Sequence, residues 1–359
     1  MENAFQINDG LRETASCGNA AVYDSRRGLI FAEHMTGEQC MYGEASGVVN
    51  LSIFPPSQPW NVRQVQIDKV PGASRGFLCT AIYLVGDAKV RVMYTKDRGE
   101  EIGVYYKDYD FLADTLSERH TVYLHTGEGD LNADNAGYAR YLKSQGFDCP
   151  SDRQLIINKV TEYNGELYTA VTLDGPGYPV LCRIKENLLC PFAILPEAGR
   201  YEFRYYRDEN GIYGLNRSII DDTGIGKIAY FVSKDEGKTW KKTLFEDGIQ
   251  SRPEIIPYYG KPLILYNYRS ENSQENMPPM HHHRTAVKFI YDGKVIIDVF
   301  SKYGIVEPEL VNICGDLYML YSSMSQALMY QNDACWVEDG IHVENAKEKS
   351  SWLKIGYIL

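Results

Sequence analysis

A strand, a short polar or glycine-containing turn and a second strand recur six times along this chain. Helical periodicity is almost absent, and the recurring pattern is typical of antiparallel hairpins. The units have equal spans and occupy residues 19–34, 80–95, 159–174, 202–217, 254–269 and 307–322. One or two further strand-like runs follow each unit. Repeats of this kind predict an all-β fold, a six-bladed β-propeller with four-stranded antiparallel blades.

The spacing of the units leaves room for insertions within a single domain over residues 1–359. Unit starts lie 61, 79, 43, 52 and 53 residues apart. The longest interval predicts an insertion at about 120–150, with a short helix and a loop, and the polar run at 270–284 predicts a second loop. Either the first 18 or so residues or the tail at 350–359 is expected to complete a blade and close the ring. Five or seven blades stay open as alternatives.

One segment carries a motif of five spaced residues, Ser233, Asp235, Gly237, Thr239 and Trp240. This S-x-D-x-G-x-T-W pattern resembles the Asp-box of sialidases and related β-propellers. The resemblance implies a hairpin turn between the two outer strands of one blade. Ser233 and Asp235 are expected to accept hydrogen bonds from nearby backbone N–H groups, while Gly237 supplies a positive φ. Trp240 is expected to pack between adjacent sheets. The motif indicates architecture, because it lies away from the ligand-binding face of such propellers.

Charge and hydropathy exclude several classes of function. The formal net charge is −11, which argues against nucleic acid or an anionic membrane as the partner. No apolar run reaches the length of a membrane helix. The start of the chain lacks a signal-peptide pattern. It therefore predicts a cytoplasmic protein if that start is native, and a secreted or periplasmic one if a signal peptide was removed.

The cysteine and histidine patterns do not predict a metal site. The eight cysteines contain no C-x-x-C pair. Cys79, Cys182 and Cys314 lie in strand-like runs and are interpreted as buried small hydrophobic residues. The three adjacent histidines at 281–283 cannot all face one metal ion. Neither a metal nor another cofactor is therefore predicted.

The register of the six units identifies residues at one mouth of the central tunnel. In a propeller blade, the first residue of the innermost strand and the last residue of the second strand lie close together at this mouth. The pairs are Asn19/His34, Thr80/Thr95, Lys159/Asp174, Glu202/Arg217, Glu254/Arg269 and Glu307/Ser322. A structural alternative is that these are solvated strand ends and ion pairs, since exposed strand ends are often charged.

A sugar that carries a carboxylate would fit these charged residues, because guanidinium groups bind carboxylates bidentately and stay charged. The predicted substrate-binding residues are Arg204, Arg217, Arg252, Arg269, Glu307 and Asp174. Glu202 and Glu254 are predicted to hold the arginines, or to act as acid, base or nucleophile. In the fourth and fifth units a Glu and an Arg are separated by 14 residues, which is similar to the sialidase arrangement.

The sequence departs from the sialidase pattern at positions expected to be catalytic, so different catalytic groups are expected. Sialidases open their first blade with Phe/Tyr-Arg-Ile-Pro, whereas residues 17–23 contain no Arg. Their nucleophilic Tyr belongs to the last blade, so Tyr303 and Tyr321 are the corresponding catalytic candidates. His34 ends a strand at the mouth, where a neutral imidazole can serve as acid or base; a hydrogen-bonded structural role is the alternative.

These residues predict a carbohydrate-active enzyme whose partner is an anionic carbohydrate. The first hypothesis is a glycoside hydrolase of sialidase-like fold that cleaves a terminal sugar of an acidic glycan. A polysaccharide lyase acting on uronic acids and a non-catalytic carbohydrate-binding propeller are the alternatives. The Tyr-rich runs at 205–207 and 266–269 either stack on sugar rings or pack between blades.

Overall fold

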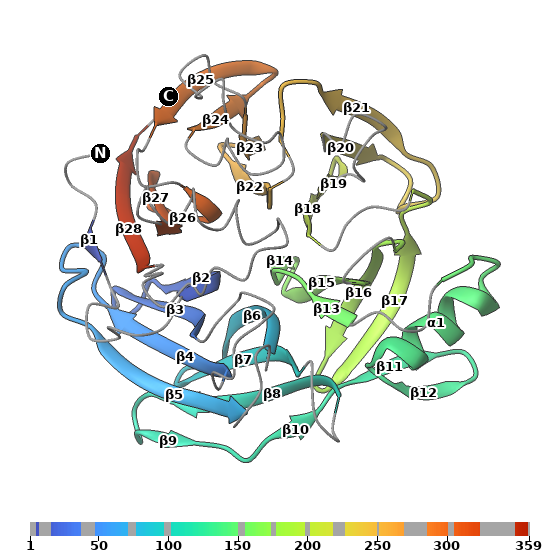
Figure 1. Cartoon of the computed structure of the whole chain (residues 1–359), viewed down its shortest axis with the longest axis horizontal. Coiled ribbons are helices and arrows are strands. Elements are labelled where there is room, and N and C mark those ends of the chain that lie inside the picture. Colours follow the sequence, from blue (N-terminus) through green and yellow to red (C-terminus); the bar gives the residue numbers. More distant parts are fainter. Residues whose placement is uncertain are drawn as a thin grey trace, which may run out of the picture.

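The computed structural model describes residues 5–6, 16–36, 47–70, 77–96, 102–149, 155–173, 177–197, 202–217, 227–249, 251–268, 286–300, 305–323 and 349–357. These residues form six sheets, and every strand pairing in them is antiparallel except that of β11 with β17. Figure 1 shows the sheets arranged around a common centre. The predicted all-β fold is therefore confirmed.

The first three sheets contain the insertions. The first is β2 (Ser16–Asp24), β3 (Leu29–Thr36), β4 (Gly47–Phe54) and β5 (Arg63–Val70). The second is β6 (Phe77–Val85), β7 (Lys89–Lys96), β8 (Gly103–Asp110), β9 (Thr115–Leu116) and β10 (His120–Thr121). The third is β13 (Leu155–Ile157), β14 (Thr161–Tyr163), β15 (Glu166–Leu173), β16 (Val180–Lys185), β17 (Leu188–Ile194), β11 (Tyr123–Thr126) and β12 (Gly129–Asn132).

The last three sheets have four strands each among the described residues. The fourth is β18 (Phe203–Asp208), β19 (Gly211–Arg217), β20 (Ile228–Ser233) and β21 (Lys241–Phe245). The fifth is β22 (Glu254–Tyr258), β23 (Lys261–Asn267), β24 (Ala286–Tyr291) and β25 (Lys294–Phe300). The sixth is β26 (Val306–Ile313), β27 (Asp316–Ser323), β28 (Lys349–Gly356) and β1 (Phe5–Gln6).

The innermost strands contact one another around the centre. Strand β2 contacts β6, β6 contacts β13, and β14 contacts β18. Strand β18 contacts β22, β22 contacts β26, and β26 returns to β2. The sixth sheet joins both ends of the chain, because Phe5 of β1 pairs with Trp352 of β28. The tail and the N-terminal segment therefore both contribute to this sheet, where the sequence predicts that one of them completes a blade.

Apolar clusters fill the space between successive sheets. The first and sixth sheets, for example, pack through Phe54, Leu320 and Trp352, with the Phe54 and Trp352 rings edge to face at 5.2 Å. Fully burying one such large side chain stabilises the fold by about 1.5–3 kcal/mol. Tyr205, Tyr206 and Tyr266 are also buried. The packing interpretation of the Tyr-rich runs is therefore correct for these three residues, and the sugar-stacking one is wrong for them.

A short helix lies in the segment 120–150, as predicted. Helix α1 (Asn135–Ser144) begins at Asp134, whose carboxylate accepts a hydrogen bond from the Gly137 backbone N–H at 2.8 Å. Tyr138 and Leu142 are buried in the cluster between the second and third sheets. Because α1 has ten residues, no helix in the described ranges is long and apolar enough to cross a membrane.

The turn between β20 and β21 has the geometry expected from its sequence. The Ser233 hydroxyl accepts a hydrogen bond from Gly237 N at 2.8 Å, and Asp235 accepts one from Thr239 N at 2.9 Å. Hydrogen bonds from the Thr239 hydroxyl and backbone lower the pKa of Asp235 to about 2. Gly237 has a φ of +82°, and the Trp240 ring packs edge to face against Phe231. The turn thus joins the two outer strands of the fourth sheet.

The predictions for the cysteines are partly wrong. Cys182 is buried, as predicted, but Cys314 is exposed in the turn between β26 and β27 with a φ of +53°. The apolar run around Cys314 belongs to two strands, and the residue itself lies at the tip between them. The side chain of Cys79 lies outside the described residues.

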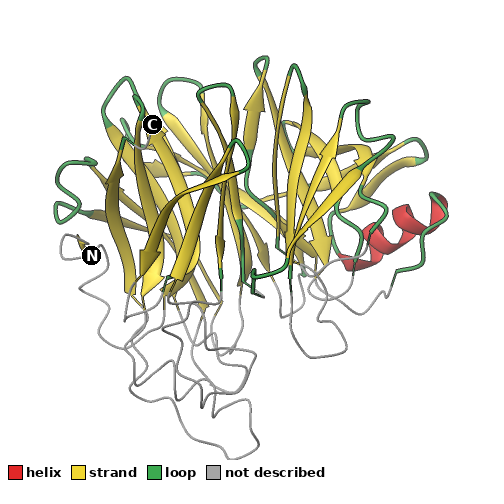
Figure 2. Ribbon diagram, turned by 90° about the horizontal axis from the view of Figure 1, so that it is seen from above, coloured by secondary structure: helices red, strands yellow, loops and turns green. Residues whose placement is uncertain are grey.

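The hairpin formed by the two innermost strands of each four-stranded sheet places its turn on one face of the ring and its open strand ends on the other. Figure 2 shows the turns between the strands along one face, with the C-terminal end of the chain on the same side. The first residues of β18 and β22 and the last residues of β19 and β23 therefore lie on the opposite face. We call this opposite face the mouth face.

Candidate functional site

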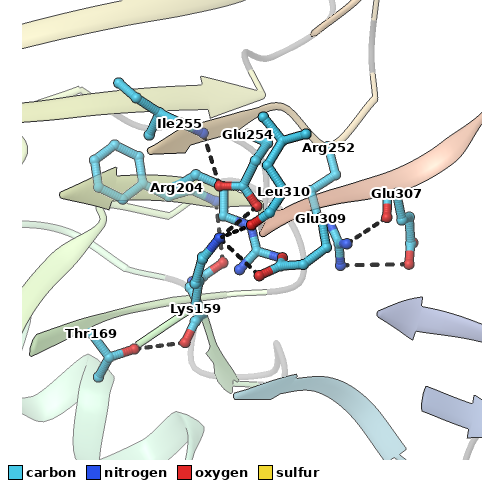
Figure 3. Close-up of polar contacts among 11 residues, drawn as sticks. Lys159, Thr169, Arg204, Arg252, Glu254, Ile255, Glu307, Glu309 and Leu310 are labelled. Atoms are coloured by element: carbon cyan, nitrogen blue, oxygen red, sulfur yellow. Dashed lines mark hydrogen bonds and ion pairs between the residues drawn. The ribbon is translucent and has the colours of Figure 1, made fainter. Parts of the chain in front are cut away.

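The side chain of Lys159 lies at the centre of a charged cluster that four sheets build together. Its ammonium is 3.1 Å from Glu254 Oε2 and 2.8 Å from Glu309 Oε1, and it donates to the Leu310 carbonyl at 3.4 Å (Figure 3). Arg204 Nη2 lies 3.4 Å from Glu309 Oε2. We define Lys159, Arg204, Arg252, Glu254, Glu307 and Glu309 as the central cluster.

The side chain of Asn158 anchors the backbone next to Lys159. The preceding residue, Asn158, donates from Nδ2 to the Ala170 carbonyl at 3.2 Å, and its Oδ1 accepts from Phe203 N at 3.3 Å. The first bond fixes Asn158 to its own sheet, and the second ties it to the start of β18 in the next sheet. These two bonds fix the backbone next to Lys159, whose ammonium lies between Glu254 and Glu309.

Glu254 and Glu309 are both fully buried and have different pKa shifts. Burial raises the pKa of Glu254 to about 7, and the neighbouring Glu309 carboxylate adds to this increase. Burial also acts to raise the pKa of Glu309, but Lys159, Arg204 and Arg252 overcome it and lower this pKa to about 2. Glu309 is thus held as a carboxylate. Glu254 holds a proton over part of the neutral range, because two close carboxylates resist ionising together.

Arg252 binds Glu307 through both the side chain and the backbone. Arg252 Nη2 donates to the Glu307 carbonyl at 2.6 Å, and Nη1 lies 3.7 Å from Glu307 Oε2. Glu307 has a φ of +50°, which is uncommon for a residue with a long side chain, and the register of β26 shifts between Val306 and Glu309. Strained backbone of this kind clusters at functional sites.

A second buried pair joins Glu202 and Arg217, the first and last residues of the fourth unit. Arg217 Nη1 lies 2.5 Å from Glu202 Oε2, and the Arg217 backbone N–H donates to the Glu202 carbonyl at 3.1 Å. Both residues are nearly buried, with exposures of 3% and 6%. Glu202 lies two residues before Arg204, so both side chains are on the same side of the strand. The predicted meeting of first and last residues is observed here.

Several predicted site residues lie apart from the central cluster or outside the described ranges. Tyr321 is 2% exposed and packs in the apolar cluster between the fifth and sixth sheets, so its position does not favour a role as nucleophile. His34 lies on β3 opposite Asn50, and its side chain is outside the described part. Asp174, Arg269 and Tyr303 are also outside it. The roles predicted for these residues stay predictions.

Sequence reasoning did not assign a role in the site to Lys159 or Glu309. Lys159 is the first residue of the third unit and was open to the same argument as Glu202. Glu309 follows Glu307 by two residues, a spacing that in a regular strand places two side chains on one side, and here the register shifts between Val306 and Glu309. The signal was therefore present, but neither residue belongs to an E-x14-R pair.

The charges of the site are arranged in pairs of a cation and a carboxylate. In the described ranges, no group of three or more His, Cys, Asp or Glu side chains is placed to hold a metal ion. Four cations and four carboxylates take part in these ion pairs: Lys159, Arg204, Arg217 and Arg252, and Glu202, Glu254, Glu307 and Glu309. Protonation of Glu254 would leave one positive charge in excess among these eight groups, a change that favours an anionic ligand beside them.

No family model matches this sequence, and a search of curated proteins also gives no match. Solved structures do match the fold. A Trypanosoma rangeli sialidase in complex with the inhibitor DANA is similar with a TM-score of 0.58 and 11% identity, over 96% of this chain and 55% of that chain. The chain has a sialidase-like fold.

The endosialidase of phage phi92 is also similar, with a TM-score of 0.59 and 11% identity, over 98% of this chain and 69% of that chain. This chain spans little more than half the length of the Trypanosoma rangeli sialidase. At this identity the likeness concerns the fold, and the residues of the site have to be judged on their own geometry.

Proposed function

We propose that this protein is a glycoside hydrolase, built as a six-bladed sialidase-like propeller, that cleaves a terminal sugar of an acidic glycan. The observation that carries the proposal is the set of three buried arginines, Arg204, Arg217 and Arg252, each next to a glutamate. A glutamate beside each guanidinium fixes its orientation, and an oriented guanidinium binds a carboxylate bidentately. The similarity to structures of a sialidase and an endosialidase supports the same class of substrate.

Arg204 retains a donor for such a ligand. Its Nε–H is buried and makes no hydrogen bond within the described part of the chain. Buried donors are normally satisfied, so an unsatisfied one next to other cations indicates a place for an acceptor. In the proposed complex, the ligand carboxylate accepts from Arg204 and lies near Arg252 and Arg217.

Glu254 would adjust the net charge around the arginines by gaining or losing a proton. Because its side chain is fully buried, we assign it to adjusting the charge around the arginines and not to direct attack on the sugar. Glu202 is 3% exposed and lies beside Arg217, the last residue of β19, and it is the carboxylate that we propose for acid or base chemistry. His34 and Tyr303 are the remaining candidates on this face.

The test is hydrolysis of acidic oligosaccharides by the whole chain. Sialyl and uronyl oligosaccharides are incubated with protein, and released reducing sugar is measured. Arg217→Lys keeps the charge but loses the planar guanidinium, so KM for an acidic substrate should rise by about tenfold or more. The matched control is Arg207→Lys, since Arg207 lies on the neighbouring strand β18 of the same sheet but pairs with Glu236 at 2.9 Å, away from the mouth face. Equal effects of the two variants would contradict the proposal.

A binding-only propeller is the second candidate, and the burial of the central glutamates favours it. Glu254 and Glu309 are both 0% exposed, which leaves no open carboxylate pair at the centre. If acidic oligosaccharides bind but release no reducing sugar, the protein is a binding module. If absorbance near 235 nm rises on uronic acid polymers, the reaction is β-elimination and the protein is a lyase.

A further inference from the structure

Two exposed tyrosines lie together on the face opposite the mouth face. Tyr259 belongs to the turn between β22 and β23, and Tyr357 follows β28 in the neighbouring sheet. Their exposed fractions are 55% and 58%. Glu254 is the first residue of β22 and Tyr259 follows its last, so the tyrosines lie about 15 Å from the central cluster along the strand.

The two rings form a fixed pair. Their centroids are 5.8 Å apart and the rings are nearly perpendicular, at 82°. The Tyr258 hydroxyl donates to the Gly315 carbonyl at 2.9 Å, and the Tyr291 hydroxyl donates to the Tyr259 carbonyl at 3.2 Å. These bonds support the backbone beneath the pair, so little ordering is needed when a ligand binds.

Tyr259 occupies a backbone position that normally selects other residues. Its φ is +45° and that of Gly260 is +74°, and two successive positive φ angles are characteristic of a type I′ hairpin turn. Asn, Asp and Gly are preferred at the first of these positions, and the turn between β24 and β25 has Asp292 there with a φ of +51°. A bulky aromatic residue at this point strains the turn, and more than half of its surface stays exposed.

The rim of the pair is polar, and two of its lysines are paired with carboxylates. Lys261 pairs with Asp292 at 2.7 Å, and Lys354 pairs with Asp316 at 2.6 Å. Each cation is therefore matched by a carboxylate. Such a rim offers hydrogen bonds to hydroxyl groups but does not favour a charged ligand. Exposed aromatic faces with a polar, neutral rim fit a pyranose ring, which has an apolar face and hydroxyl groups around its edge.

We propose that Tyr259 and Tyr357 form a second carbohydrate-binding surface, which stacks on an uncharged pyranose unit of a polysaccharide. This surface differs from the charged mouth face in position and in ligand charge. It would hold a polymer on the protein whether or not the mouth face cleaves it.

The test is affinity electrophoresis of the whole chain in native gels that contain arabinoxylan, galactomannan or mixed-linkage β-glucan. We expect at least one polymer to retard the wild-type protein. Tyr357→Ala and Tyr259→Asn should each weaken binding roughly fivefold to tenfold, as expected for the loss of one aromatic contact. Tyr259→Asn also relieves the strained turn, so its melting temperature should rise while binding falls. Misfolding cannot produce that combination.

Two control variants make the result specific. Trp60→Ala removes an exposed aromatic residue, 61% exposed, from a turn in another sheet and should leave the retardation unchanged. Arg217→Lys alters the mouth face and should also leave it unchanged, so failure of the hydrolase proposal is distinguishable from failure of this one. The proposal is overturned if no polymer retards the wild type, or if Tyr259→Asn and Tyr357→Ala migrate like it. It is also overturned if sedimentation shows a dimer that Tyr357→Ala dissociates, because the tyrosines would then be a protein interface.

Discussion

Glu254 and Glu309 come from neighbouring sheets and share one counter-ion, the ammonium of Lys159, at 3.1 and 2.8 Å. The single ammonium cannot neutralise both carboxylates in full. Glu309 has Arg204 in addition, at 3.4 Å, whereas Glu254 accepts a hydrogen bond from the neutral Ile255 backbone N–H at 2.8 Å. This asymmetry explains why the proton resides on Glu254, and it leads to measurable effects of pH.

Stability should fall as pH rises through neutrality. The pKa of Glu254 is raised from 4.5 to about 7 in the folded protein, so the folded state binds the proton more tightly than the unfolded state between these values. The corresponding stabilisation is complete below pH 4.5 and is lost as pH rises through about 7, with a total on the order of 3 kcal/mol. Urea unfolding at pH 5 to 8 measures the slope.

Glu254→Gln is the variant that isolates this effect. A neutral amide cannot lose a proton, so the difference in free energy of unfolding between variant and wild type should increase in favour of the variant as pH rises. A difference that stays constant over this range would show that Glu254 does not titrate there.

Removal of the shared counter-ion should be strongly destabilising. Lys159→Met leaves Glu309 and Glu254 buried without their ammonium, and loss of one partner of a buried ion pair costs about 3–5 kcal/mol. Adding Glu254→Gln to Lys159→Met should restore part of the loss. Lys261→Met is the control, because Lys261 pairs with Asp292 on the surface and should have little effect on thermal unfolding. Similar melting temperatures for Lys159→Met and Lys261→Met would contradict the buried-pair account.

Carboxylate binding at the mouth face should be coupled to proton uptake. The cluster is balanced when Glu254 is ionised, so an added anion is accommodated best when Glu254 takes up a proton. Affinity for a sialyl or uronyl oligosaccharide should therefore increase as pH falls through about 7. Calorimetry in buffers of different ionisation enthalpy counts the protons. At pH 7.5 we expect the wild type to take up as many as one proton per bound oligosaccharide, and Glu254→Gln to take up fewer. Equal proton uptake by the two proteins would contradict this coupling.

Gly237→Ala should destabilise the turn between β20 and β21. A Cβ at this position would lie 2.4 Å from Ala193 Cβ, and the φ of +82° disfavours any side chain. We expect about 1–2 kcal/mol from the left-handed backbone and about 1–3 kcal/mol from the clash. Gly260→Ala separates the two effects, because Gly260 has a φ of +74° but no atom within 4 Å of the added Cβ. Thermal unfolding should show a larger loss for Gly237→Ala.

The hairpins and part of the site were predictable from sequence because they depend on local patterns. Glu202 and Arg217 end two strands of one hairpin, so strand register alone brings them together. Lys159 and Glu309 meet only because two non-adjacent sheets face the same centre, and no local pattern encodes that distance. Tyr321 shows the same limit in reverse, since its predicted place at the mouth depended on which side of β27 its ring occupies.

The pairing of β1 with β28 has a consequence for the order of folding. Phe5 and Trp352 are 347 positions apart (352 − 5), so this contact closes one of the longest loops in the chain. Hairpins such as β18–β19 close within a few residues and can form while the polypeptide is still being synthesised. The sixth sheet has to wait until its last strand exists. Contacts of such high sequence separation form slowly, so we expect closure of this sheet to be the slow step of refolding.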